Sequence, residues 1–206
     1  MNALRSLLLL AVPLAFVLSG RALVRATPRP GRGTLALLAL VGLPFLLQLL
    51  FPELLDAFRR DPQQIMWHGE YWRLLTAILF QDGWLAGLAF NLVILLLIAP
   101  LAETVWGSLP TVLLFFLGGS LVNGLLVPMG VVGAGNSLAN LVLGGSLGAV
   151  ALLRGRGRRE AVVGLGLGAG LGLLGDYHWV ALVVGTLAGA LLWSVWRERG
   201  RGPTTV

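Results

Sequence analysis

The chain has 206 residues, of which 57% are hydrophobic and only 12% are charged. Soluble domains carry about 25% charged residues, so this composition excludes an ordinary soluble domain and indicates an integral membrane protein. The net charge of +6 does not indicate nucleic-acid binding, because the arginines lie between apolar runs. Cysteine is absent and the only histidines are His68 and His178. These counts exclude disulfides and disfavour a zinc or haem site built from several Cys or His ligands, so we expect no cofactor and no metal.

Seven apolar runs approach the length of about 20 residues that a helix needs to cross a bilayer. The predicted spans are residues 7–24, 34–51, 84–100, 110–128, 131–153, 161–175 and 178–196. The first span follows Arg5 and also fits a signal peptide that would be cleaved after about residue 26. The arginines that come next favour a retained N-terminal anchor, because such charge rarely follows a secretory signal.

Arginine placement predicts the orientation of the chain. Arginines cluster at 21–32, 154–159 and 197–201, and seven spans put all three clusters on one side of the membrane. Positive loops stay in the cytoplasm, whereas the long segment 52–83, which is acidic on balance, falls on the opposite side. We therefore expect the N-terminus outside and the C-terminus in the cytoplasm. Arginine without lysine, together with many Ala, Gly and Leu residues, favours a GC-rich bacterial genome and a bacterial cytoplasmic (inner) membrane.

Residues 131–150 combine polar side chains with glycine inside a predicted span. Asn136, Ser137 and Asn140 lie within two helical turns, among five glycines. Polar side chains in hydrocarbon are costly, so they indicate either helix packing or a site. Small residues recur near one helical face, at Gly133, Ser137, Gly144 and Gly148. This spacing favours a packing face, with a ligand or partner site as the alternative.

Four motifs carry a resemblance to a known family. They are YWRLLT at 71–76, FN at 90–91, PLAE at 100–103 followed by GS at 107–108, and GTLAG at 185–189. In this order and spacing they resemble the rhomboid intramembrane protease family over about residues 65–195. The resemblance implies a core of six transmembrane helices with the first loop outside. The orientation predicted from the arginines agrees with this core if residues 7–24 form one additional N-terminal helix.

The resemblance also implies a serine–histidine dyad, and here the sequence departs from the family. Gly135 stands at the expected serine and Leu182 at the expected histidine, while Gly87 replaces an oxyanion-hole histidine. The oxyanion-hole asparagine is retained as Asn91, and Gln81 or Asp82 replaces a loop histidine. Without a nucleophile and a base, covalent acyl transfer has no route. We therefore expect a catalytically inactive member, a rhomboid pseudoprotease, and no enzyme.

A displaced dyad of Ser137 and His178 is the alternative. On a continuous helix, Ser137 lies about 200° around the axis from Gly135 and faces away from it. His178 lies about one turn before Leu182. We expect this geometry to keep the two side chains apart. The simpler interpretation makes His178, with Asp176 and Tyr177, the cap of a short outer loop.

The remaining motif residues have structural interpretations. Trp72 and Arg73 are expected to anchor the outer loop at the membrane interface, and Glu103 to fasten the turn at 107–108. Gly185 and Gly189 are expected to pack against a neighbouring helix. The candidate polar core or partner-binding residues are Asn91, Asn136, Ser137 and Asn140.

These observations define the expected organisation and function. Residues 1–33 form an N-terminal transmembrane anchor with a basic linker, residues 34–197 a rhomboid-like core, and residues 198–206 a short basic tail. The expected function is non-proteolytic binding of transmembrane segments or of a membrane protein complex, within the lipid bilayer and without nucleic acid. An active protease that uses Ser137 and His178 is the alternative. A carrier or channel is disfavoured, because Arg21 is the only charged residue embedded in a span.

Overall fold

Residues 3–198 of the computed structural model fold into helices, and this part of the chain forms no β-strand beyond one isolated bridge. Within these residues, six helices are long and apolar enough to cross a bilayer, and the protein is an all-α membrane protein. Residues 199–206, nearly all of the expected tail 198–206, lie outside the described residues. The six helices are α1 (Ala3–Leu23), α2 (Arg32–Leu50), α6 (Trp84–Trp106), the segment Ser108–Leu126, α9 (Ser137–Arg154) and α11 (His178–Glu198).

The remaining helices are shorter. Three of them follow α2, namely α3 (Leu54–Phe58), α4 (Pro62–His68) and α5 (Arg73–Thr76). In the continuous helix Ser108–Leu126, the π-helical turn η1 (Leu114–Gly118) separates α7 (Ser108–Leu113) from α8 (Gly119–Leu126). Helix α10 (Arg158–Leu173) has 16 residues. It covers most of the span expected at 161–175, but its length of about 24 Å is less than the hydrocarbon thickness of about 30 Å.

The expected spans differ from the helices at one informative place. Hydropathy places a span at 131–153, but residues 131–136 are irregular and α9 begins only at Ser137. Gly133 pairs with Arg60 through two backbone hydrogen bonds of 2.9 and 3.1 Å. Gly135 has a φ of +138°, a conformation that glycine adopts readily and other residues do not. Ser137 is therefore the first residue of a helix and not a residue in its second turn.

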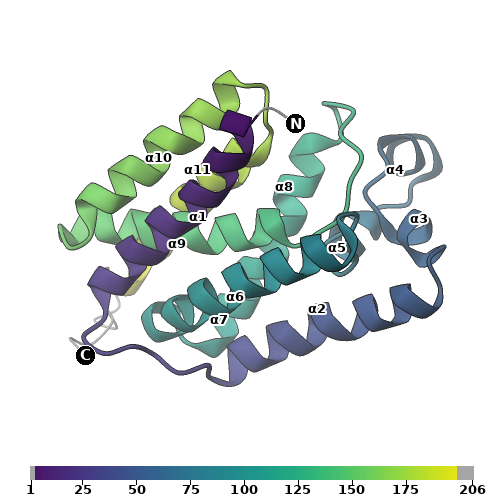
Figure 1. Cartoon of the computed structure of the whole chain (residues 1–206). Coiled ribbons are helices and arrows are strands. Elements are labelled where there is room, and N and C mark those ends of the chain that lie inside the picture. Colours follow the sequence, from purple (N-terminus) through teal and green to yellow (C-terminus); the bar gives the residue numbers. More distant parts are fainter. Residues whose placement is uncertain (1–2, 199–206) are drawn as a thin grey trace.

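Helix α9 runs through the centre of the molecule. Every residue from Leu138 to Ala151 is buried, and the helix contacts α1, α6, α10 and α11. Figure 1 shows α1 lying across α9, between α10 and α6, with α2 on the outer side of α6. The small-residue face expected on this helix does not pack as a single surface. Only its glycines Gly144 and Gly148 lie against Phe16 of α1.

Glycines allow α9 and α11 to approach closely. A Cβ atom on Gly185 would overlap the carbonyl oxygen of Val142, and one on Gly189 would lie 2.6 Å from the carbonyl oxygen of Ser146. Both pairs have the same sequence offset, so the two helices run parallel. Their first residues therefore lie at the same end of the molecule.

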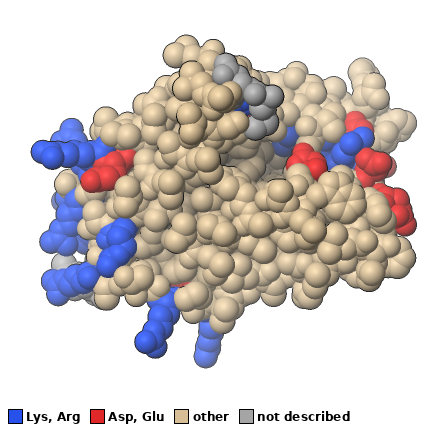
Figure 2. Space-filling model, viewed as in Figure 1, with Lys and Arg blue, Asp and Glu red and all other residues tan. Residues whose placement is uncertain are grey.

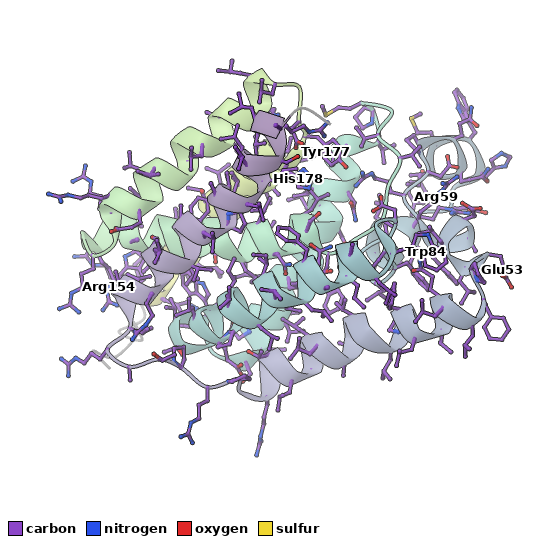
Figure 3. The ribbon with its side chains drawn as sticks, in the orientation of Figure 1. Glu53, Arg59, Trp84, Arg154, Tyr177 and His178 are labelled. Atoms are coloured by element: carbon purple, nitrogen blue, oxygen red, sulfur yellow. The ribbon has the colours of Figure 1, made fainter. Side chains whose placement is uncertain are left out.

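Charged side chains separate along the molecule. Figure 2 shows most of the arginines at one end, where α9 ends, and most of the acidic side chains at the other, beside α3 and α4. Figure 3 shows Arg154 and Glu53 at these two opposite ends. This separation follows the helix axes, as expected for a bundle whose two ends face different aqueous compartments.

Glu103, near the end of α6, fastens the start of α2. Its carboxylate accepts hydrogen bonds from the N–H groups of Gly31, Gly33 and Thr34 and from the hydroxyls of Thr34 and Ser108. The first N–H groups of a helix have no intrahelical acceptor and carry partial positive charge, which a carboxylate satisfies. One side chain thus joins the ends of α2, α6 and α7.

Candidate active site

Ser137 and His178 meet at the point where α9 and α11 begin. The Oγ atom of Ser137 lies 3.1 Å from Nε2 of His178. The expectation that these side chains lie apart is wrong, because it assumed a continuous helix through Gly135. The irregular segment 131–136 changes the direction in which Ser137 points, and the parallel packing of the two helices brings His178 to it.

One face of α11 explains why His178 faces α9. His178, Ala181, Gly185 and Gly189 follow one another at intervals of three, four and four residues, which place them on the same side of a helix. Ala181, Gly185 and Gly189 are buried. Leu182, where the resemblance expects the histidine, packs instead against Gly168 of α10.

Asp176 lies on the other side of the His178 ring. Its Oδ1 atom is 2.6 Å from Nδ1 of His178 and accepts the His178 backbone N–H at 2.8 Å. Its Oδ2 atom accepts a hydrogen bond of 2.5 Å from Nε of Arg5, which comes from the first turns of α1. The Asp176 side chain is fully buried. Figure 3 shows Tyr177 and His178 beside α1.

Environment sets the charge of Asp176. Burial by itself raises the pKa of this carboxyl group, but hydrogen bonds from the ring and backbone of His178 and from Arg5, with the charge of the imidazolium, lower it further than burial raises it. The resulting pKa lies well below the ordinary value of about 3.9. Asp176 is therefore a carboxylate at neutral pH.

The expected polar residues assemble beside Ser137. Asn91 donates from Nδ2 to Oε1 of Gln81 at 2.9 Å, and Gln81 donates from Nε2 to Oδ1 of Asn136 at 2.8 Å. Asn140 donates from Nδ2 to the backbone carbonyl of Asn91 at 3.0 Å. The network links α6, α9 and the loop that follows α5. The Oδ1 atom of Asn91 is buried and has no hydrogen-bond partner among the described residues.

Two cavities open beside Ser137 and His178. The first has a volume of about 30 Å³, and its walls include Leu9 and Pro13 of α1 and Asn140 of α9. This volume is enough for about one or two water molecules. The second has a volume of about 120 Å³ and lies on the side of the loop 131–136. Water can therefore approach Ser137 through the larger cavity, beside the loop 131–136. Helix α1 covers the smaller cavity.

Arg60 and Tyr177 form part of the larger cavity. Arg60 is buried and donates from Nε to the carbonyl of Val131 at 2.8 Å and from Nη1 to Oδ1 of Asn123. Its guanidinium lies 5.8 Å from the centre of the Tyr177 ring. Burial raises the pKa of Tyr177 more than the neighbouring Arg60 lowers it, so the phenol keeps its proton at neutral pH.

The other positions that the sequence singled out lie at different distances from the site. Gly135 is next to it, because a Cβ atom there would lie 3.2 Å from Oε1 of Gln81. Gly87 faces open space on α6. Trp72 is exposed, and Arg73, the first residue of α5, is buried and pairs with Glu70 at 2.5 Å. None of these last three residues contacts Ser137 or His178 among the interactions of the described residues.

Residues 3–198 contain no group of three His, Asp or Glu side chains placed to hold a metal ion. Comparison with known proteins gives no match: no family model fits the chain, and neither a curated protein nor a solved structure matches it.

Proposed function

We propose that the chain is an intramembrane serine hydrolase, a protease of rhomboid type that acts on transmembrane segments. Ser137 is its nucleophile and His178 its general base. The observation that carries the proposal is the 3.1 Å contact between Ser137 Oγ and His178 Nε2 at the start of two closely packed helices. A serine becomes a nucleophile when an adjacent base can take its proton, and this distance is within the range that such a transfer requires.

The reaction follows from this pair. Ser137 Oγ attacks the carbonyl carbon of a peptide bond while His178 Nε2 takes the hydroxyl proton. His178 then gives that proton to the departing amine as the C–N bond breaks, which leaves an acyl-serine. A water molecule from the larger cavity attacks the acyl carbon, with His178 again as base, and releases the carboxylate product and free Ser137. The substrate supplies the carbonyl and water supplies the second nucleophile, so no further reactant is needed.

The helix that carries Ser137 also offers oxyanion stabilisation. The N–H groups of its first turn have no intrahelical acceptor, and the macrodipole is positive at this end. We expect these N–H groups to act as the oxyanion donors, because this end of the helix favours a negative charge that develops beside Ser137 Oγ. The buried amide of Asn140 donates to the backbone carbonyl of Asn91 and so holds α9 to α6 around this point.

The motifs at 71–108 and 185–189 support the rhomboid part of the proposal. In it, residues 34–197 form the six-helix core and α1 is an additional helix. The arginines at one end of the molecule support a cytoplasmic position for that end and an outer position for Ser137. The bacterial inner membrane completes the proposal on the basis of residue composition alone.

A second candidate is the non-proteolytic one, a rhomboid-like pseudoprotease that binds transmembrane proteins or subunits of a membrane complex. The small volume of the cavity beneath α1 favours it, because about 30 Å³ does not admit a peptide. In that case the contact between Ser137 and His178 is a partly buried polar link between helices, worth about 0.6–2 kcal/mol.

Labelling with a fluorophosphonate probe separates the two candidates. Purified protein in mild detergent should be labelled, and Ser137→Ala and His178→Ala should abolish the labelling. Ser120→Ala is the matched control, because the Ser120 hydroxyl is buried and has no partner among the described residues. Cleavage of a transmembrane substrate should follow the same pattern. Folded wild-type protein that neither labels nor cleaves would favour the second candidate.

A further inference from the structure

We propose that Asp176 is the positioning residue of His178 and that Arg5 holds Asp176 in place, so that helix α1 completes the site. This proposal rests on the proposed serine hydrolase and adds two residues to it. Asp176 precedes His178 by two residues, and Arg5 lies 171 residues away in sequence. The two contacts place the Asp176 carboxylate between the base and a helix that the sequence assigned to a separate anchor.

Both oxygens of Asp176 are occupied. Oδ1 accepts from the backbone N–H and lies 2.6 Å from the ring Nδ1 of His178, and Oδ2 accepts from Arg5. An ionised carboxylate can only accept hydrogen bonds, so Nδ1 must carry the ring proton. Nε2 is then unprotonated in the neutral ring and faces the Ser137 hydroxyl as an acceptor. This is the tautomer that a general base for Ser137 requires.

Arg5 supplies the charge that a buried carboxylate needs. A buried ion without a partner is strongly unfavourable, and a neutral imidazole does not compensate it. The Arg5 side chain is 34% exposed whereas that of Asp176 is fully buried, so the guanidinium reaches inward from the rim of the site. Its hydrogen bond also fixes the rotation of the carboxylate, which keeps Oδ1 directed at the His178 ring.

One face of α1 faces the site. Arg5, Leu9 and Pro13 follow one another at intervals of four residues and therefore lie on one side of the helix. Arg5 binds Asp176, while Leu9 and Pro13 cover the small cavity beside Ser137. At the other end of α1, the Ser19 hydroxyl donates to the carbonyl of Gly157 at 3.1 Å. Helix α1 is thus fixed to the bundle at both ends.

Other charged or titratable groups surround His178 and remain in every variant tested. Tyr177 stacks on its ring with centroids 4.9 Å apart, and Arg60 lies above Tyr177. Asp82 lies in the larger cavity with both His178 and Arg60. A change in pH dependence that follows substitution of Asp176 alone therefore reports on Asp176.

The first experiment measures the rate of fluorophosphonate labelling of Ser137 against pH. Asp176→Asn should slow labelling about 100-fold or more at neutral pH, because the amide can donate to Nδ1 and favour the wrong tautomer. The pH profile of its labelling should also change, because the ring loses the adjacent carboxylate. Asp176→Glu should restore part of the rate. Arg5→Gln should slow labelling about tenfold and Arg5→Lys should recover most of that loss.

Arg21→Gln is the matched control on α1. Arg21 lies at the far end of this helix, where it donates to the carbonyl of Val24 and to the hydroxyl of Thr27, and its loss should leave the rate unchanged. If the wild type is labelled and Asp176→Asn shows the same rate and the same pH profile, the positioning role of Asp176 is wrong and the proposed hydrolase stands. If folded wild type is not labelled, the proposed hydrolase is wrong.

A second measurement does not depend on activity. His68→Gln leaves His178 as the only histidine, so nitrogen NMR of labelled histidine reports its tautomer directly. We expect the proton on Nδ1 in this variant and a shift toward Nε2 protonation when Asp176→Asn is added. A neutral ring that carries its proton on Nε2 and not on Nδ1 while Asp176 is present would contradict the proposal, whether or not the probe labels the protein.

Discussion

Gly185 of α11 lies directly against the carbonyl of Val142 of α9, with no room between them for a Cβ atom. This approach determines where α11 sits along α9. Because Gly189 meets Ser146 in the same register, the two helices are held in parallel over at least one full turn. The contact between Ser137 and His178 at their first residues depends on this register.

Gly185→Ala should therefore destabilise the protein and weaken the site together. The added methyl group must push the backbones apart, and overpacking of this kind costs about 1–3 kcal/mol. We expect a lower midpoint of thermal unfolding in detergent and slower labelling of Ser137. Gly166→Ala on α10 is the control, because a Cβ atom there meets no described atom within 4 Å. Equal stability of the two variants would show that the α9–α11 approach is looser than described.

Apolar spans could be predicted from the sequence because long hydrophobic runs dominate hydropathy. The residue at which α9 begins could not be predicted in this way. Residues 131–135 contain only Val, Ala and Gly, and hydropathy cannot distinguish a glycine loop from a helical turn. The positive φ of Gly135 and its hydrogen bond to the Ala77 carbonyl depend on chain segments far away. For this reason the predicted direction of the Ser137 side chain was wrong.

His178 could have been found from helical spacing. It shares one face with Ala181, Gly185 and Gly189, and a small-residue face predicts contact with a neighbouring helix. The family resemblance places the histidine three residues before Gly185, where this chain has Leu182. The pairing of Asp176 with Arg5 had no sequence signal, because 171 residues separate them and neither belongs to a motif.

Glu103→Gln should destabilise the protein by about 1–3 kcal/mol. The carboxylate accepts five hydrogen bonds from the start of α2 and from the first residue of α7. The amide group of glutamine replaces one acceptor oxygen with a donor that faces other donors. Thermal unfolding in detergent measures the change. Glu53→Gln is the control, because the Glu53 side chain is exposed and makes no hydrogen bond or ion pair within residues 3–198. A similar loss in both variants would point to a general effect of charge.

The contribution of Asp176 to stability should depend on pH in a defined direction. Its pKa is lowered in the folded protein, so the unfolded chain binds the proton more readily, and the carboxylate stabilises the fold above the unfolded value of about 3.9. The stability difference between wild type and Asp176→Asn should therefore not decline between pH 7 and about pH 5, and should decline below about pH 4. Thermal unfolding at a series of pH values tests this. A decline that begins near neutral pH would show that the carboxylate has no such stabilised charge.

Gly135→Ser should not create a working nucleophile, although the resemblance places the family's serine at this position. The φ of +138° is strained for any residue with a side chain, at a cost of about 1–3 kcal/mol. The new Cβ atom would also lie 3.2 Å from Gln81 Oε1 and 3.5 Å from Asn91 Nδ2, inside the amide network and not beside His178. We expect the double variant Gly135→Ser, Ser137→Ala to remain unlabelled by a fluorophosphonate and to unfold at a lower temperature than Ser137→Ala alone. Labelling at residue 135 would instead show that the loop 131–136 can rearrange, and that the nucleophile position of this fold is not confined to the first residue of α9.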